Sequence, residues 1–205
     1  MAGNESLTTP GFTPVTLEGS DVRLEPIRLE HVPLLWEAAR DVVEETFRWW
    51  PIPMRSPDDL RRFVELILSE QERGLSIPFA TIERKSGFAV GSTRFLNIDV
   101  RNRRVEIGST WVLPAWQRTA VNTEAKYLML RHAFEHWRCL RVEFKTDALN
   151  QQSRVAILRL GAKEEGTFRK HVITWNGRVR DSVYFSILDT EWPEIKLRLE
   201  QRFRR

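Results

Sequence analysis

The order of patterns between residues 103 and 146 constrains the fold of this chain more than any other feature. Residues 103–113 alternate as a strand does, residues 122–137 carry apolar side chains at spacings of three and four as an amphipathic helix does, and residues 142–146 alternate again. A strand, a helix and a strand joined by such short linkers indicate a parallel crossover, since an antiparallel pair needs only a hairpin. The sequence therefore predicts a parallel strand–helix–strand unit inside one sheet.

Further alternating segments extend this sheet. Residues 77–83 and 90–98 precede the crossover, and the turns between them predict three consecutive antiparallel strands. Shorter segments predict a hairpin at each end of the chain, formed by 15–17 with 22–25 and by 171–175 with 179–188. We expect an α+β (mixed α/β) fold whose twisted, mostly antiparallel sheet has about seven strands and one parallel pair.

Helices are predicted on both faces of this sheet. The clearest helix starts at Ser56, a natural N-cap, with Pro57 at the first helical position and Asp59 placed to close a capping box, and it ends at Gly74. An aromatic, proline-containing loop at 47–53 precedes it. The remaining helices are expected at 30–45, 122–137, 150–160 and 191–202.

Composition limits the class of protein. A chain of 205 residues, 41% of them hydrophobic, predicts one compact domain at 15–205 behind a flexible N-terminal tail at 1–14. No segment approaches the roughly 20 apolar residues of a membrane span, and the start lacks the basic and apolar blocks of a signal peptide. Cys139 is the sole cysteine, so no internal disulfide forms. We expect a cytoplasmic protein with no membrane partner.

The turn at 117–122, Gln-Arg-Thr-Ala-Val-Asn, leads from a strand into a helix. The first N–H groups of a helix have no intrahelical acceptor, and an arginine stands beside them, so this turn is typical of a phosphate-binding site. An ordinary turn with a capped helix is the alternative. The net charge of +4 agrees with an acidic cofactor, a nucleic acid or a nucleoprotein as partner.

Several short motifs stand in a fixed order around this turn, namely Val105-Glu106-Ile107-Gly108, Asn150 with Ser153, Leu160-Gly161 with Glu165-Gly166, and Arg180-Asp181. In this order they resemble the GNAT acyltransferase superfamily, and more narrowly its Rim branch, the N-terminal acetyltransferases of ribosomal proteins. The resemblance covers most of the chain and implies the GNAT fold. It departs at the turn, where the superfamily pattern Gln/Arg-x-x-Gly-x-Gly/Ala stands here with Ala120 and Asn122.

The resemblance implies acetyl-coenzyme A (acetyl-CoA) as the cofactor. Its pantetheine is expected to pair with the strand end, where an amide near Val112 or Leu113 would hydrogen-bond the thioester oxygen, and its pyrophosphate is expected on the turn. Ala120 keeps its N–H group, and Asn122 is expected either to cap the helix or to contact a phosphate. The expected cofactor-binding residues are Trp111, Val112, Leu113, Gln117, Arg118, Thr119, Ala120, Val121, Asn122, Thr123, Asn150 and Ser153.

Glu106 is the leading candidate for the base that deprotonates the acceptor amine. Unbroken strand alternation places it with Gly108 and Thr110, on the side opposite Val105, Ile107 and Trp111. A cross-strand ion pair with an arginine such as Arg94 is an equal alternative.

Two further side chains are candidates for acid–base chemistry. Many superfamily members carry a tyrosine acid where this chain has Ile157, so the resemblance points to Ser153 as the group that hydrogen-bonds or protonates the leaving thiolate. Capping of a helix is the alternative for this serine. His171 is a weaker candidate for the base or for binding the acceptor.

The acceptor is expected to be a primary amine, with Trp49 and Trp50 lining its pocket or else packing in the core. Neutralising a chain-terminal amine at pH 7 costs about 1.4 kcal/mol and a lysine about 4.6, which favours a protein N-terminus. A small-molecule amine is one alternative, and a non-catalytic protein that binds CoA, RNA or a nucleoprotein is another. A direct nucleic-acid ligand is not favoured, a homodimer stays open, and no metal site is expected, because His132 and His136 lack a third ligand.

Overall fold

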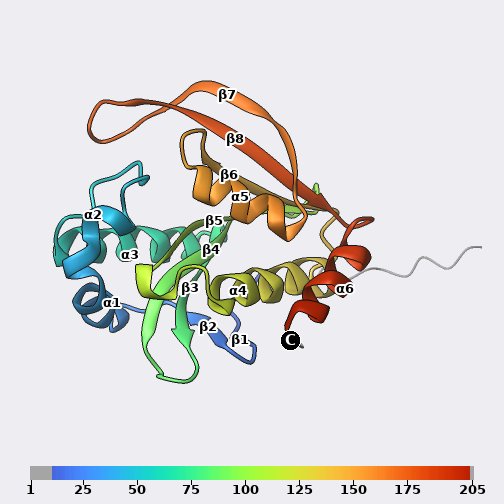
Figure 1. Ribbon diagram of the computed structural model, residues 1–205, viewed down its shortest axis with the longest axis horizontal. Helices are drawn as coiled ribbons and strands as arrows, with labels where there is room; N and C mark the ends of the chain where they lie inside the picture. Colours follow the sequence, from blue (N-terminus) through green and yellow to red (C-terminus); the bar gives the residue numbers. More distant parts are fainter. Residues whose placement is uncertain (1–10, 204–205) are drawn as a thin grey trace, which may run out of the picture.

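The computed structural model describes residues 11–203, which form an eight-stranded sheet with helices on both faces (Figure 1). The strand order is β1-β2-β3-β4-β5-β6-β8-β7, and β5 and β6 form the parallel pair. The predicted mixed sheet and its crossover are confirmed. The strands are β1 (Leu17–Glu18), β2 (Val22–Pro26), β3 (Ser76–Glu83), β4 (Ala89–Asp99), β5 (Arg104–Val112), β6 (Arg141–Asp147), β7 (Lys163–Ile173) and β8 (Val179–Leu188).

Residues 1–10 of the expected N-terminal tail lie outside the described residues. Its remainder, residues 11–14, has no regular secondary structure, and the ring centroid of Phe12 lies 4.5 Å from that of Trp137. Within residues 11–203 no helix has both the length and the apolar character that a bilayer span requires.

Two groups of helices flank the sheet. Arg94 of β4 contacts Glu70 on one face, and its neighbour Thr93 contacts Lys126 on the other, because successive strand residues point to opposite faces. The first face carries α1 (His31–Ala39), α2 (Val43–Thr46) and α3 (Pro57–Glu72). The second carries α4 (Ala120–Arg131), α5 (Gln151–Leu160) and α6 (Trp192–Phe203).

The helix expected at 30–45 is interrupted. A 3-10 turn, Arg40–Val42, separates α1 from α2, and Val42 leaves the helical conformation with φ −129° and ψ 18°. The interruption lets Phe47 turn into the core, where its ring packs 5.0 Å from that of Trp111. The expectation of one continuous helix is therefore wrong, because burial of the following aromatic residue outweighs helix continuity.

A bulge in β5 changes which side chains share a face. The register of β5 against β4 shifts at Ser109, whose φ is +46°. An extra residue on one strand reverses the alternation beyond it, so Trp111 lies on the same face as Glu106 and Thr110 lies on the opposite face. The prediction of which faces Thr110 and Trp111 occupy is wrong. It assumed unbroken alternation, and the sequence of so short a segment does not reveal a bulge.

The hairpin of β7 and β8 is long and bent. β7 begins at Lys163, well before the predicted start at 171, and nearly all its side chains are exposed, so no apolar alternation marks it. Register shifts near Gly166 and Lys170 bend the hairpin, and Figure 1 shows it arching over α5 and β6. At its tip, the N–H of Trp175 donates to the carbonyl of Pro51 at 2.9 Å, which joins the hairpin to the 47–53 loop.

Candidate active site at the divergence of β5 and β6

The two parallel strands separate after three paired residues. β5 and β6 pair from Arg104 with Arg141 to Glu106 with Glu143, and beyond that point they no longer pair with each other. We call this gap the divergence, bounded by residues 107–112 of β5 and 144–147 of β6. A strand edge without a partner presents free backbone groups, so the divergence can take an extended ligand as a further strand.

One backbone amide of β5 faces this gap. The N–H of Leu113 donates to the carbonyl of Val90 on β4 at 2.9 Å. Neighbouring residues of a strand direct their backbone groups to opposite sides. Val112, which precedes Leu113, therefore directs its N–H and C=O away from β4 and toward the divergence. Consistent with this, the side-chain amide of Gln117 donates to the Val112 carbonyl at 3.1 Å. Of the two amides expected to contact a thioester, Leu113 is already bonded and Val112 faces the divergence.

The turn after β5 ends in an anion-binding geometry. A 3-10 turn, Pro114–Trp116, leads to Thr119, which is the N-cap of α4 and accepts from the Val121 N–H at 3.3 Å. Among the described residues, no protein acceptor receives the N–H groups of Arg118, Thr119 and Ala120. This helix end therefore fits a pyrophosphate group.

Asn122 lies inside the first turn of α4. The helix begins two residues before it, so the expectation that Asn122 caps the helix is wrong, because the Thr119 hydroxyl takes that position. Its side-chain oxygen is buried and has no hydrogen-bond partner in the described part of the chain. A buried amide oxygen without a hydrogen-bond donor costs free energy. Asn122 is therefore the polar side chain of this turn that can accept a hydrogen bond from a bound ligand.

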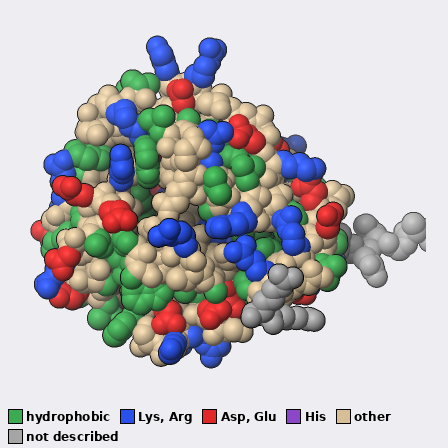
Figure 2. Space-filling view, in the orientation of Figure 1, with side chains coloured by type: hydrophobic (Ala, Val, Ile, Leu, Met, Phe, Trp, Pro, Cys, Tyr) green, Lys and Arg blue, Asp and Glu red, His purple; other side chains and the backbone are tan. Residues whose placement is uncertain are grey.

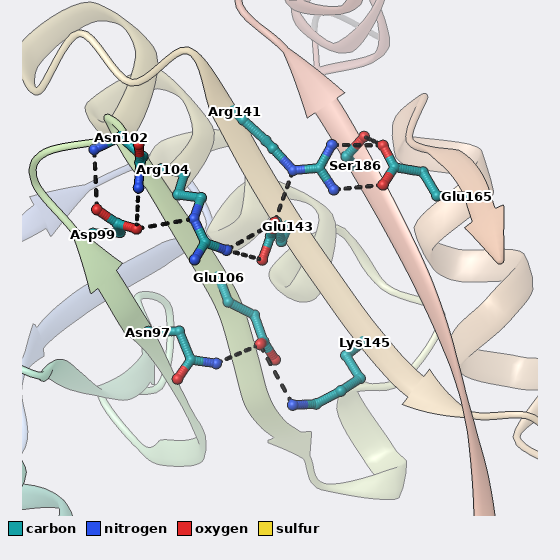
Figure 3. Close-up of polar contacts among 10 residues, drawn as sticks. All are labelled: Asn97, Asp99, Asn102, Arg104, Glu106, Arg141, Glu143, Lys145, Glu165 and Ser186. Atoms are coloured by element: carbon teal, nitrogen blue, oxygen red, sulfur yellow. Dashed lines mark hydrogen bonds and ion pairs between the residues drawn. The ribbon is translucent and has the colours of Figure 1, made fainter. Parts of the chain in front are cut away.

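Glu106 lies beside the divergence on the face of the sheet that carries α1 to α3. It is 3% exposed, and its carboxylate accepts from Asn97 at 2.8 Å and lies 3.5 Å from the ammonium group of Lys145 (Figure 3). Arg94, named as the alternative partner, pairs with Glu70 instead, so the cross-strand ion pair of Glu106 is made with Lys145 and not with an arginine. Lys145 was missed from the sequence, although alternation on β6 places it opposite the apolar Phe144.

The other carboxylates around Glu106 are held by arginines. Arg104 bridges Asp99 and Glu143, and Arg141 bridges Glu143 and Glu165 (Figure 3). Hydrogen bonds from Arg141 lower the pKa of Glu165 to about 2, so that carboxylate stays charged. With Glu106, these groups line a cavity of about 930 Å³. Glu106 differs from its neighbours in having an amide and a lysine as partners.

The remaining candidates lie on separate elements. Asn150 is the N-cap of α5, and its side chain accepts from the N–H of Ser153 at 3.0 Å, which is the capping role. Ser153 is half-buried at the start of that helix. The side chain of Gln152 donates to Gln117 at 2.8 Å, so α5 and the turn meet across the divergence.

His171 is exposed on β7, and its ring lies 5.8 Å from that of Tyr184. Burial and the charges of Lys145 and Arg180 lower its pKa, while the charge of Glu106 opposes them. The imidazole is therefore neutral at pH 7 and shares an electrostatic environment with Glu106.

The two tryptophans of the 47–53 loop have different surroundings. Trp50 packs edge-on against Phe63 at 4.8 Å, inside the aromatic cluster under α3. Trp49 is half-buried, and the guanidinium of Arg178 lies 5.8 Å from its ring. Trp49 thus faces the tip of the β7–β8 hairpin.

The sequence of residues 21–163 matches the family described as acetyltransferase (GNAT) domain. The chain belongs to the GNAT acetyltransferase family. It is 30% identical to a GCN5-related N-acetyltransferase from Brucella melitensis, with a TM-score of 0.85 over 95% of this chain and 89% of that one. Members of this family use acetyl-CoA as co-substrate, and the free amides of the turn and the divergence fit such a molecule.

Two similar proteins have names that belong to the Rim branch. YdaF of Bacillus subtilis, provisionally described as a ribosomal N-acetyltransferase, is 33% identical over 106 residues, which are 52% of this chain and 57% of YdaF. RimJ of Mycobacterium smegmatis, solved in complex with CoA-disulfide, is 22% identical and superposes with a TM-score of 0.82 over 96% of this chain and 98% of that one. The likeness to YdaF supports the resemblance to Rim-type enzymes, and the likeness to RimJ shows a shared fold.

Proposed function

We propose that this acetyltransferase moves the acetyl group of acetyl-CoA to the N-terminal α-amine of a protein. The observation that carries the proposal is the divergence, where the free amide of Val112 lies on β5 and the carboxylate of Glu106 lies on the same strand. An acyl donor and an amine can therefore meet beside one strand. The anion-binding turn at the start of α4 supports the same placement of the donor.

The residues of the chain divide the chemistry between them. The thioester of acetyl-CoA supplies the acetyl group. Val112 directs an N–H toward the place where negative charge grows on the acyl oxygen, and a preorganised donor of this kind lowers the barrier by a few kcal/mol. Glu106 accepts a proton from the acceptor ammonium, directly or through water. Ser153 hydrogen-bonds the departing thiolate, with His171 as a neutral second acceptor near Glu106.

The acceptor amine follows from the strength of the available base. A carboxylate is a weak base, and neutralising an α-amine at pH 7 costs about 3 kcal/mol less than neutralising a lysine. The cavity beside Glu106, about 930 Å³, is large enough for several residues of an extended peptide. We therefore propose a peptide N-terminus, and not a small amine, as the acceptor.

The test is acetyl transfer to a panel of peptides in the presence of acetyl-CoA. Each peptide carries one α-amine and one lysine, and mass spectrometry of fragments assigns the acetyl group to one of them. We expect acetylation of the α-amine, and a peptide with a blocked N-terminus serves as the control. Calorimetry that detects no binding of acetyl-CoA would exclude the proposal, and transfer to small amines alone would exclude the peptide acceptor.

A further inference from the structure

Arg180 of β8 belongs to a motif that the proposed chemistry leaves without a role. Side chains alternate along a strand, so Arg180 lies on the same face as Tyr184, which is opposite Lys145 in the β6–β8 register. Lys145 reaches Glu106 on that face. Arg180 is 8% exposed, which is unusual for a guanidinium group.

The guanidinium of Arg180 has no carboxylate of its own. Its Nε donates to the hydroxyl of Ser182 at 3.2 Å and lies 3.8 Å from Asp147. Asp147 already binds Arg178 and accepts the N–H of Leu149 at 3.0 Å. One carboxylate therefore serves two arginines, and among residues 11–203 no acceptor receives the terminal nitrogens of Arg180.

Burial without a full ion pair is costly for a cation. Desolvation lowers the pKa of Arg180, while the negative charges of Asp147 and Glu106 act against it. Arg178 shares Asp147 with Arg180, and Lys145 pairs with Glu106 on the same face. A carboxylate from outside would give the guanidinium of Arg180 a partner of its own.

The surface around Arg180 fits such a ligand. The tip of the hairpin meets the 47–53 loop through Trp175 and Pro51, and Arg178 lies over Trp49. The hairpin tip and the 47–53 loop therefore meet beside this group of arginines. Figure 2 shows Lys and Arg side chains projecting from the upper edge of the molecule, where Figure 1 places β7 and β8.

We propose that Arg180 binds a carboxylate of the acceptor, within about three residues of the amine that is acetylated. This inference rests on the proposed function for the position of the amine beside Glu106. The planar fork of a guanidinium matches a carboxylate through two parallel hydrogen bonds. An extended peptide advances about 3.3 Å per residue, so the first residues of an acceptor can span the space between Glu106 and Arg180.

The experiment compares peptides that differ in one atom group. Glutamate or glutamine stands at position 1, 2 or 3 of an otherwise identical peptide, and kcat/KM for acetyl transfer is measured for each pair. We expect the glutamate peptide to be preferred about tenfold at one of these positions. Alanine and alanine amide form a further pair, which shows whether the α-carboxylate of a free amino acid is the ligand instead.

Three variants separate Arg180 from general charge effects. Arg180→Gln should bring the glutamate-to-glutamine ratio to about one, and Arg180→Lys should keep a reduced preference. Arg169→Gln, at an exposed position of the same hairpin, changes the net charge equally and should keep the wild-type ratio. If Arg180→Gln does not fold, Arg180→Lys and the wild-type panel decide.

Equal kcat/KM values for all wild-type pairs would overturn this inference, and so would a preference that survives Arg180→Gln. If no peptide is acetylated, fluorescence anisotropy of labelled peptides tests Arg180 alone. Tighter binding of the glutamate peptide, lost in Arg180→Gln, would support the carboxylate site while the proposed function fails. Equal binding of both peptides would overturn the carboxylate site.

Discussion

The two sides of the divergence, one proposed for the acyl donor and one for the acceptor, differ in the kind of group that they present. On the proposed donor side, the available groups belong to the backbone, namely the amide of Val112 and the first N–H groups around Thr119. On the proposed acceptor side they are side chains from separate strands, with Glu106 on β5, Lys145 on β6 and Arg180 on β8. A site made of backbone groups depends less on side-chain identity, so we expect Ala120 and Asn122 to leave the N–H groups of the turn available. A site made of side chains depends on every charge.

The largest effect is expected on the acceptor side. Glu106→Gln removes the proposed base and should lower kcat about 100-fold while leaving the affinity for acetyl-CoA unchanged, because the carboxylate does not contribute to the donor side. Steady-state kinetics and calorimetry measure the two quantities. Glu194→Gln, at an exposed position of α6, removes a carboxylate outside the cavity and is the control. An equal loss in both variants would assign the effect to net charge.

The next effect concerns stability, through a buried lysine in the helix that follows the proposed phosphate-binding turn. Lys126 of α4 is buried, and its ammonium group donates to Thr93 at 2.9 Å and to Thr110 at 2.5 Å. Burial lowers its pKa from 10.5 to about 7. Between these two pKa values the unfolded chain binds more protons than the folded chain, so the free energy of unfolding rises with pH from about 7 to 10. Below pH 7 the buried charge of Lys126 destabilises the fold by its full amount.

Lys126→Met should therefore raise the free energy of unfolding at pH 7, by a gain on the order of 3 kcal/mol, and remove this pH dependence. Urea unfolding at pH 7, 8 and 9 measures both effects, and Lys85→Met, at an exposed turn, is the control. Parallel pH profiles for wild type and Lys126→Met would contradict the assignment.

A smaller effect is expected from a charge placed in the turn. Asn122→Glu puts a carboxylate beside the proposed phosphate site and should weaken acetyl-CoA binding about tenfold, with a smaller loss at high salt because screening reduces the repulsion. Asn122→Gln keeps the amide and is the control. Equal affinity in wild type and Asn122→Glu would place the phosphates elsewhere.

The smallest effect separates catalysis from capping in α5. Ser153→Ala should lower kcat about fivefold without changing the midpoint of thermal unfolding, because its hydroxyl is proposed to assist the leaving thiolate. Asn150→Ala removes the cap and should lower stability by about 1 kcal/mol. Differential scanning fluorimetry and kinetics on both variants test this. A stability loss in Ser153→Ala would assign that residue to the helix.

The parts of the fold that carry a periodic apolar pattern could be predicted, and the others could not. The crossover and the helix capped at Ser56 follow from local spacing and capping chemistry, and both are present. The early part of β7 was missed because its side chains are exposed and follow no period. The bulge at Ser109 was missed because a single inserted residue leaves no signature in one sequence.

The candidate site shows the same division. Glu106 could be named from its place on a strand next to the turn, and the turn itself could be proposed as an anion site. Lys145 and Arg180 could not, because their importance arises from cross-strand neighbours that lie far away in the sequence. A motif around Arg180 was visible, but its unbalanced charge was not.

The sequence by itself determined the element order, the parallel crossover, the family and the strand that carries Glu106, because these depend on local periodicity and short motifs. Only the tertiary structure decided that Val112, and not Leu113, directs its amide into the divergence, since strand register makes that choice. It also decided that Glu106 faces a lysine and not Arg94, and that one aspartate serves two arginines. Ion pairs form between side chains that lie far apart in the sequence, so only the tertiary structure shows which charges have partners.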